Sequence, residues 1–376
     1  MSRDLPTAMG QPAGGVEPLG VAIHALDLGH LRLAGTAAVV GCGPIGLLLS
    51  QLLLVAGAHG RAYAQLATQG VRLVAIGSRR EESARALAAQ LGVPEARCYT
   101  DYDRLLADPE VQLVSLCTPN GLHAREAVAG AQAGKHLLIE KPVATTPEDL
   151  RAVLAAVERA GVTAAAGFIQ RWNPLVNTLR AMREQGDFGH IFFATADYWF
   201  GRERPGWMRE PDLAGSSFLV GAIHAVDSIR YITGQDIVEV EARGVAVGDY
   251  YQYPPVAAAL VRYAGGALGT ISSSLVGHTG YVLNLEIVGT EGSARNDQIF
   301  LKRFPGLQGW MTLPIPGPAS GDVSQLPFPQ LVADLVSAIR SGAEPRASLR
   351  STINTHEVCF AVDRALAGGG PVRLPL

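Results

Sequence analysis

The chain has 376 residues, of which 48% are apolar and 17% are charged, and its formal net charge is -3. This length predicts two or three domains, and the composition is typical of a protein with a substantial core. The small net charge argues against a basic surface for nucleic acid or an anionic membrane. Four scattered cysteines without a C-x-x-C pair predict neither a disulfide framework nor a zinc site. Free thiols suit a cytoplasmic protein.

A long uncharged run begins near residue 37. Residues 37–58 contain no charged side chain and are numerous enough for a membrane helix. Gly41, Gly43, Pro44 and Gly46 interrupt the run, so a buried strand, turn and helix explain it better. No basic segment precedes it, as a secretory signal would require.

The first part of the chain alternates between strand-like and helix-like segments. Residues 1 to about 35 predict a loose leader and one helical segment. Strands are expected at 37–40, 71–76, 111–117 and 136–139, and helices at 81–91 and 124–133. Short apolar strands alternating with helices predict an α/β domain with a parallel sheet covered on both faces, at residues 36–145.

The remainder, residues 146–376, has a different pattern. A helix to Ala160 begins with a capping signature at Thr145-Thr146-Pro147-Glu148. Strands follow without intervening helices, at 191–200, 237–246, 257–263, 267–273 and 282–288; later come helices at 330–340 and around 356–366, and an edge-like tail at 371–376. This pattern predicts a substrate-binding and oligomerisation domain of α+β type, with a large, mostly antiparallel open sheet.

Two glycine-rich stretches lie close together in the first domain. A full G-x-G-x-x-G pattern, the first loop, follows an apolar run and consists of Gly41, Cys42, Gly43, Pro44, Ile45 and Gly46. Such a turn at a helix start lets backbone N–H groups face a pyrophosphate, which predicts a Rossmann-type dinucleotide site. Residues 55–60, the second loop, nearly repeat the pattern, but Val55 replaces its first glycine.

Spacing favours the second loop. Ser78, which would meet the adenosine ribose, lies 23 residues after the start of the second loop and 37 after the start of the first. One helix over 45–69 would be about 37 Å long at ~1.5 Å per residue, against strands of ~20 Å. We therefore predict that the first loop binds phosphate, that its helix ends or breaks near 57–60, and that a second helix covers 61–69. The second loop as the phosphate site, or neither loop, are the alternatives.

The residues after the second predicted strand bear on the choice of cofactor. A carboxylate there would hold a ribose 2′-hydroxyl, whereas an arginine accommodates a 2′-phosphate. The chain has Ser78, Arg79 and Arg80 at this point. They favour NADP(H) over NAD(H), unless they are only a solvated helix start.

Four separated motifs then resemble one family. They are T-P-N-G-L-H at 118–123, G-K-H-L-L-I-E-K-P at 134–142, G-F-I-Q-R-W-N-P at 167–174 and G-A-I-H-A-V-D at 221–227. From about residue 58 to its end, the chain resembles the Gfo/Idh/MocA family of sugar and cyclitol oxidoreductases. Residues 17–58 resemble instead a fragment of the zinc-type medium-chain alcohol or polyol dehydrogenases. That family's zinc-binding half is missing, so no metal is expected, and the chain looks like a fusion at the first loop.

Lys141 and His224 are the candidate catalytic residues. Lys141 directly follows a parallel strand, where open α/β sheets place their ligands. The resemblance makes it the lysine that contacts the reacting hydroxyl and implies a cis bond before Pro142. His224 is the candidate acid–base, because an imidazole with a pKa near ~6.5 exchanges protons at neutral pH.

One departure from the family affects His224. Many members carry Asp or Asn four residues before this histidine, where the chain has Val220. A valine cannot orient the imidazole or the substrate as a polar i, i+4 neighbour would. The proton relay or the set of substrates is therefore expected to differ, and Asp227 is a candidate replacement.

Other site residues follow from the resemblance alone. Around the nicotinamide it implies Thr118, Pro119, Asn120, His123 and Glu140, together with Lys141. Around the substrate it implies Arg171 and Asp227, together with Lys141 and His224, and Tyr198 is a further candidate because it belongs to a strand end of the second domain. Arg202, Arg204 and Trp207 follow a strand of the second domain and are further candidates, while Arg171 and Asn173 are equally well explained as structural.

The predicted function is hydride transfer between NAD(P) and a secondary hydroxyl or ketone of a sugar, cyclitol or sugar derivative. A non-catalytic NAD(P)-binding regulator on the same fold is the alternative, and an inactive fusion that binds no dinucleotide is a third. A homodimer or homotetramer is expected. The sequence leaves open which sugar, which carbon and which direction.

Overall fold

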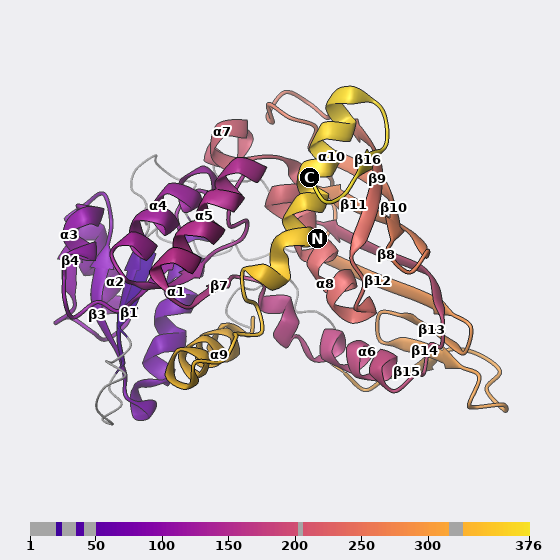
Figure 1. The fold of residues 1–376 in the computed structure, drawn as a ribbon, viewed down its shortest axis with the longest axis horizontal. Helices are drawn as coiled ribbons and strands as arrows, with labels where there is room; N and C mark the ends of the chain where they lie inside the picture. The colour runs from indigo at the N-terminus through magenta and orange to yellow at the C-terminus, as the bar shows by residue number, and fades with distance from the viewer. Residues whose placement is uncertain (1–19, 25–34, 41–49, 202–205, 316–325) are drawn as a thin grey trace, which may run out of the picture.

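Two sheets organise the molecule, one at each side of Figure 1. The computed structural model describes residues 20–24, 35–40, 50–201, 206–315 and 326–376. The first sheet has seven strands in the order β4-β3-β1-β2-β5-β6-β7, and the second has nine in the order β15-β14-β13-β12-β8-β11-β10-β9-β16. Among the described residues, no helix is long and apolar enough to cross a membrane.

The first sheet confirms the predicted parallel α/β domain. Its strands are β1 (Gly20–His24), β2 (Gly35–Val40), β3 (Val71–Gly77), β4 (Arg97–Tyr99), β5 (Leu113–Leu116), β6 (His136–Ile139) and β7 (Ala164–Ala166). Its helices are α1 (Ser50–Gln65), η1 (Ala67–Gln69), α2 (Glu81–Gln90), α3 (Tyr102–Leu106), α4 (Asn120–Gln132) and α5 (Pro147–Ala160). Strands β2 to β7 pair in parallel. Because β7 belongs to this sheet, the sheet extends beyond residue 145.

Within the expected leader, residues 20–24 form a strand, while residues 1–19 and 25–34 lie outside the described residues. This strand, β1, pairs antiparallel with β2, β3 and β5. The segment reads G-V-A-I-H, a composition with Val and Ile, which are enriched in strands.

The helix after the first loop does not break at the second loop, so this prediction was wrong. α1 is continuous from Ser50 to Gln65, and only the short η1 follows before β3. Gly57 and Gly60 are both buried inside it. A Cβ on Gly60 would lie 2.4 Å from Leu91 Cδ1, so this glycine allows α1 to approach the end of α2 closely. The second loop is therefore helix interior rather than a phosphate-binding turn.

The second sheet is mostly antiparallel, as predicted; within it β8 and β11 pair in parallel. Its strands are β8 (Ile191–Trp199), β9 (Ile237–Val245), β10 (Val256–Tyr263), β11 (Leu268–Ser274), β12 (Val282–Gly289), β13 (Gly292–Arg295), β14 (Gln298–Leu301), β15 (Met311–Thr312) and β16 (Val372–Arg373). β16 pairs with β9, which agrees with the edge-like tail.

Helical segments fill the space between the two sheets (Figure 1). They are η2 (Ile169–Trp172), α6 (Pro174–Glu184), η3 (Gly206–Arg209), α7 (Pro211–Ala214), the π-helix η4 (Phe218–Ala222), α8 (Ile223–Thr233), α9 (Phe328–Ser341), η6 (Arg350–Thr352) and α10 (Ile353–Gly368). α9 packs on α1 although the two lie far apart in the sequence, and α10 packs on β9 and α8.

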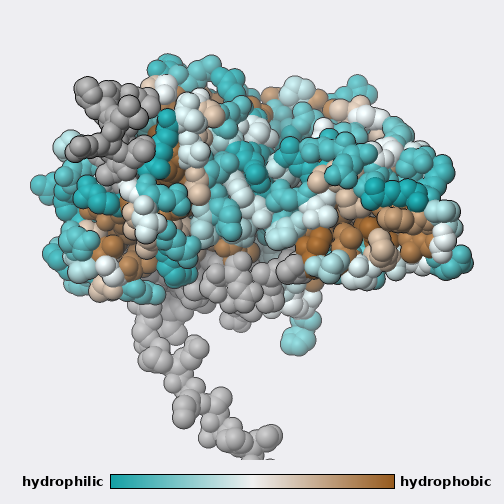
Figure 2. Space-filling model, turned by 90° about the horizontal axis from the view of Figure 1, so that it is seen from below, coloured by the Kyte–Doolittle hydropathy of each residue, from teal (hydrophilic) through white to brown (hydrophobic). Residues whose placement is uncertain are grey.

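The second sheet also presents apolar side chains to the outside. Its exposed large residues are Phe192, Val245, Leu260, Leu268, Phe300 and Met311. Figure 2 shows hydrophobic residues gathered on the side of the molecule that holds this sheet. Exposed apolar patches of this kind often mark surfaces where proteins associate. The homodimer or homotetramer expected from the sequence stays a prediction.

The first turn of α4, which belongs to the part of the molecule built on the first sheet, contacts α7 of the part built on the second sheet. A Cβ on Gly121 would lie 2.1 Å from the backbone oxygen of Asp212 in α7. Beside it, Asn120 Nδ2 donates to the oxygen of Ala214 at 2.8 Å. A glycine is therefore required at residue 121 for this close approach.

Replacing Gly121 with alanine is expected to lower the free energy of unfolding by about 1–3 kcal/mol, because the added methyl group overpacks a backbone contact. Urea unfolding measures the change. Gly309→Ala is the control, since no atom lies within 4 Å of the point that its added methyl group would occupy. Equal stability of Gly121→Ala and the wild type would contradict this account of the contact.

Candidate active site

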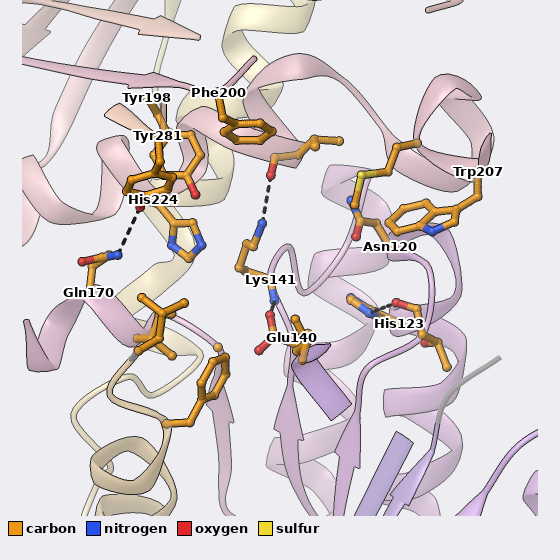
Figure 3. A pocket seen from close by; sticks show the side chains of 18 of the residues that line it. Asn120, His123, Glu140, Lys141, Gln170, Tyr198, Phe200, Trp207, His224 and Tyr281 are labelled. Atoms are coloured by element: carbon orange, nitrogen blue, oxygen red, sulfur yellow. Dashed lines mark hydrogen bonds between the residues drawn. The ribbon is translucent and has the colours of Figure 1, made fainter. Parts of the chain in front are cut away.

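A pocket of about 170 Å³ lies between the carboxyl ends of β5 and β6 and the second part of the molecule (Figure 3). The first part contributes Thr118, Asn120, His123, Glu140 and Lys141 to its lining. The second part contributes Gln170, Tyr198, Phe200, Trp207, Val220, His224 and Tyr281. Parallel α/β sheets bind their ligands at this edge.

Lys141 projects into the middle of this pocket (Figure 3). Its Nζ donates to the backbone oxygen of Val220 at 2.8 Å, across the junction between the two parts. Its backbone N–H donates to Glu140 Oε2 at 3.2 Å. The bond between Lys141 and Pro142 is cis, as the resemblance implied.

Two buried histidines hold the backbone just after Lys141. His123 Nδ1 lies 2.7 Å from the oxygen of Pro142, and its Nε2 lies 2.7 Å from the oxygen of Thr118. The N–H of Val143 donates to His356 Nε2 at 2.9 Å, and His356 Nδ1 bonds the oxygen of Thr352 at 2.8 Å. Neither ring is on the surface, so the turn after β6 is fixed from α4 and from α10.

His224 faces Lys141 from α8 (Figure 3). Its side chain is 6% exposed, and its Nδ1 has no hydrogen-bond partner among the described residues. Tyr198 packs against the ring at 5.5 Å and Phe168 at 6.2 Å between centroids. Burial, followed by the charge of Lys141, lowers the pKa of His224 well below its usual value. The imidazole is therefore neutral at pH 7 and can accept a proton.

Val220 takes part through its backbone rather than its side chain. It lies in the π-helix η4, a geometry found mostly as short bulges at functional sites. The carbonyl of Val220 accepts from Lys141, while the apolar side chain lines the pocket. The expected α-helical relation between residue 220 and His224 therefore does not hold in this form.

Arg171 and Asp227 are brought together, but neither lines the described pocket. Arg171 Nη2 and Nε donate to the two oxygens of Asp227 at 2.6 and 2.8 Å. Burial would lower the pKa of Arg171, and the Asp227 carboxylate more than offsets this, so the pKa is raised. Thr355 Oγ1 also donates to Asp227. Asp227 is thus occupied by Arg171 and does not orient His224.

Several lining residues were not expected from the sequence. Gln170 Nε2 donates to Tyr281 Oη at 3.4 Å, and Phe200 packs on Tyr198 at 5.3 Å between centroids. His59 of α1, which is not a lining residue, bonds Glu140. Gln170 lies inside a family motif and His59 inside the second loop, whereas nothing in the sequence marks Tyr281. Tyr198 and Trp207, two of the substrate candidates, line the pocket, and Arg202 and Arg204 lie outside the described residues.

Comparison with known proteins agrees with this geometry. A family model for the oxidoreductase family with an NAD-binding Rossmann fold matches residues 36–168, and one for the GFO/IDH/MocA C-terminal domain matches residues 176–295. The myo-inositol 2-dehydrogenase of Thermotoga maritima is 30% identical over 233 residues, which are 60% of this chain and 68% of that protein. The chain belongs to the Gfo/Idh/MocA oxidoreductase family.

Two further relatives are matched over less than two thirds of their own length. The match covers 59% of the uncharacterised oxidoreductase YrbE of Bacillus subtilis, at 30% identity and 53% of this chain. It covers 57% of the levoglucosan dehydrogenase of Pseudarthrobacter phenanthrenivorans, at 30% identity and 52% of this chain. A solved oxidoreductase domain protein from Kribbella flavida superposes with a TM-score of 0.76 at 26% identity, covering 89% of this chain and 98% of that one. The resemblance of residues 17–58 to zinc-type dehydrogenases gains no support from these matches.

Several residues predicted to bind the dinucleotide that the Gfo/Idh/MocA fold implies lie at the carboxyl ends of β3 and β5. Ser78 is buried directly after β3, and Arg79 beside it is exposed. Thr118 Oγ1 donates to Glu126 Oε2 at 2.6 Å, and burial raises the pKa of Glu126 to about 7. The unpartnered His224 Nδ1 marks where a bound molecule can add a contact. The first loop, Gly41 to Gly46, lies outside the described residues.

The nucleotide choice differs among Gfo/Idh/MocA members. Relatives include a scyllo-inositol 2-dehydrogenase (NAD(+)) of Bacillus subtilis and a D-xylose 1-dehydrogenase (NADP(+)) 2 of Haloferax volcanii. Family membership therefore supports NAD(P) without selecting either form. In the part of the chain that the structure describes, no group of three or more His, Cys, Asp or Glu side chains is placed to hold a metal ion.

His356 makes the stability of this site dependent on pH. Burial lowers the pKa of His356 to about 4, below its ordinary value of 6.5 in the unfolded chain. The unfolded chain therefore binds a proton at this histidine more readily than the folded protein does. The stability that neutral His356 contributes is complete above pH 6.5 and is lost as the pH falls toward 4. We expect the stability difference between the wild type and His356→Gln to shrink by on the order of 3 kcal/mol over this range.

Urea unfolding at several pH values measures this difference. His190→Gln, at an exposed position, controls for the substitution itself. A difference for His356→Gln that stays constant between pH 7.5 and pH 4 would show that the histidine is not held neutral in the folded protein.

Proposed function

We propose that this protein is an NAD(P)-dependent oxidoreductase that interconverts a secondary hydroxyl and a ketone on a sugar or cyclitol. The observation that supports it most is the meeting of Lys141 and His224 in one pocket, although 83 residues separate them in the sequence. A regulator that only binds dinucleotide has no use for an ammonium and a neutral imidazole that face one another. The names of the levoglucosan, myo-inositol and D-xylose dehydrogenases agree with this class of substrate.

The protein's own groups hold the reacting oxygen and move its proton. A bound nicotinamide dinucleotide would supply or accept the hydride. Lys141 Nζ is anchored on the Val220 oxygen, and a substrate oxygen placed beside it would be held by a charge-assisted hydrogen bond. In the oxidative direction, the neutral His224 accepts the hydroxyl proton, and in reduction the protonated ring returns it.

The lining of the pocket favours a neutral substrate. Among the described lining residues only Glu140 and Lys141 carry a formal charge at pH 7, and no arginine is present to pair with a carboxylate or phosphate. Tyr198, Phe200 and Tyr281 form an aromatic wall beside His224 (Figure 3). Aromatic faces fit the C–H side of a ring, while Gln170 and Lys141 can bond its hydroxyls.

Lys141→Ala is expected to lower kcat by at least about 10³-fold, because the charged donor to the reacting oxygen is lost. The dissociation constant for NAD(P)H should change by less than about three-fold, since most of the dinucleotide lies elsewhere on the fold. Steady-state kinetics on a panel of neutral sugars and inositols, together with fluorescence titration, measure both. Retained turnover in Lys141→Ala would remove this lysine from the mechanism.

We also propose that NADP(H) is preferred to NAD(H), on the basis of Ser78 and the exposed Arg79 at the end of β3. NADPH should raise the melting temperature by at least about 3 °C at 100 times its dissociation constant. NADH should raise it less at equal concentration, and Arg79→Glu should reverse the order. An unchanged order in Arg79→Glu would show that this arginine does not read the 2′-phosphate, and no shift with either nucleotide would argue against the enzyme.

A further inference from the structure

We propose that His59 is a positioning residue, which acts through the Glu140 carboxylate to keep Lys141 directed at the substrate. The inference rests on the proposed function, since it assigns a role in that reaction. It also explains the second glycine-rich stretch, which is helical and brings a buried histidine to Glu140 instead of binding phosphate.

A chain of hydrogen bonds links α1 to the backbone of Lys141. Tyr63 Oη lies 2.5 Å from Ser115 Oγ, and Ser115 Oγ lies 3.2 Å from His59 Nδ1. His59 Nε2 lies 3.1 Å from Glu140 Oε1, and Glu140 Oε2 accepts the N–H of Lys141 at 3.2 Å. The chain therefore ends at the residue whose ammonium faces His224.

Only one direction of donation satisfies every member of this chain. A carboxylate can only accept, so His59 must donate its Nε2–H to Glu140. With Nε2 as the donor, Nδ1 can accept from the Ser115 hydroxyl. Burial raises the pKa of Tyr63 well above its usual value, so this phenol keeps its proton and donates to Ser115. The Tyr63 hydroxyl thus donates to Ser115, and the Ser115 hydroxyl donates to His59, which bonds Glu140.

The surroundings keep the ring of His59 in this orientation. Its side chain is fully buried, and Phe328 of α9 packs against it at 4.9 Å between centroids. Glu140 is 12% exposed and lines the pocket. A Cβ on Gly167 would lie 2.7 Å from Glu140 Oε1, so the glycine there leaves room for the carboxylate.

The consequence for Lys141 is electrostatic. Glu140 is the neighbour of Lys141 in the chain, and both line one pocket. An unrestrained carboxylate beside an ammonium would turn toward it, since the two charges attract strongly at this depth. His59 and the Lys141 N–H occupy the two carboxylate oxygens instead. Lys141 Nζ then keeps its bond to the Val220 oxygen.

The test compares kcat, KM and the dissociation constant for NAD(P)H in His59→Leu, His59→Gln, Glu140→Gln and the double variant His59→Leu with Glu140→Gln. We expect His59→Leu to lower kcat by about ten-fold or more, with the dissociation constant within about two-fold of the wild type. His59→Gln, whose amide can donate to Glu140, should recover part of the loss. The double variant should resemble Glu140→Gln alone, because coupled residues are not additive.

A matched control separates positioning from lost stability. His136 lies at the opposite end of β6, where its Nδ1 accepts the N–H of Thr163 at 2.9 Å. His136→Leu should lower the melting temperature but leave kcat within about two-fold. Unchanged kcat in His59→Leu, multiplied losses in the double variant, or an equal fall in kcat for His136→Leu would each overturn the proposal.

A second measurement does not depend on turnover, so failure of the proposed function is told apart from failure of this inference. The chain has three lysines, Lys135, Lys141 and Lys302. Limited acetylation followed by peptide mass spectrometry compares Lys141 with Lys302, whose side chain is 70% exposed. In His59→Leu, the released Glu140 carboxylate should hold the Lys141 ammonium. The ratio of acetylation at Lys141 to acetylation at Lys302 should then fall by about three-fold or more. An unchanged ratio overturns the inference even if no sugar is turned over.

Discussion

The site depends on one constraint, the fixed backbone of residues 140–143. The N–H of Glu140 bonds the oxygen of Leu116, which continues the pairing of β6 with β5. Beyond it, side chains hold the turn: Glu140 itself, then His123 from α4 and His356 from α10. Lysine has four rotatable side-chain bonds, so an ammonium is placed reproducibly only when the backbone that carries it cannot move.

A second constraint places His224 opposite that lysine. Arg171 in η2 and Asp227 in α8 form a buried pair with two hydrogen bonds, and Arg171 also donates to the oxygen of Arg346. A buried pair of this kind contributes little net stability, but a rotation of α8 would leave its charges unpaired at a high cost. The pair therefore fixes the angle of α8, and with it the direction of the His224 ring. The resemblance assigned Arg171 and Asp227 to the substrate, but in the structure they bond each other and do not line the described pocket.

The sequence was informative where local pattern decides structure. Apolar runs predicted β3 and β6 to within a residue, and the E-K-P motif marked Lys141 at the end of a parallel strand. The sequence pattern was misleading where contacts between distant elements determine the structure. Helix length and motif spacing predicted a break near residues 57–60, yet α1 is continuous and Gly60 allows it to approach Leu91 closely. No spacing rule connects His59 to Glu140, or Arg171 to Asp227, since these pairs form only when distant elements meet.

Val220 shows the same limit at the level of a single residue. Comparison with the family suggested a lost polar partner for His224, on the assumption of an α-helical turn. The turn is a π-helix, and the group that it presents to Lys141 is a backbone oxygen, which every residue possesses. A valine can therefore stand here without loss of the lysine's anchor. Val220 also lines the pocket, but the hydrogen bond that it makes with Lys141 is through its backbone oxygen.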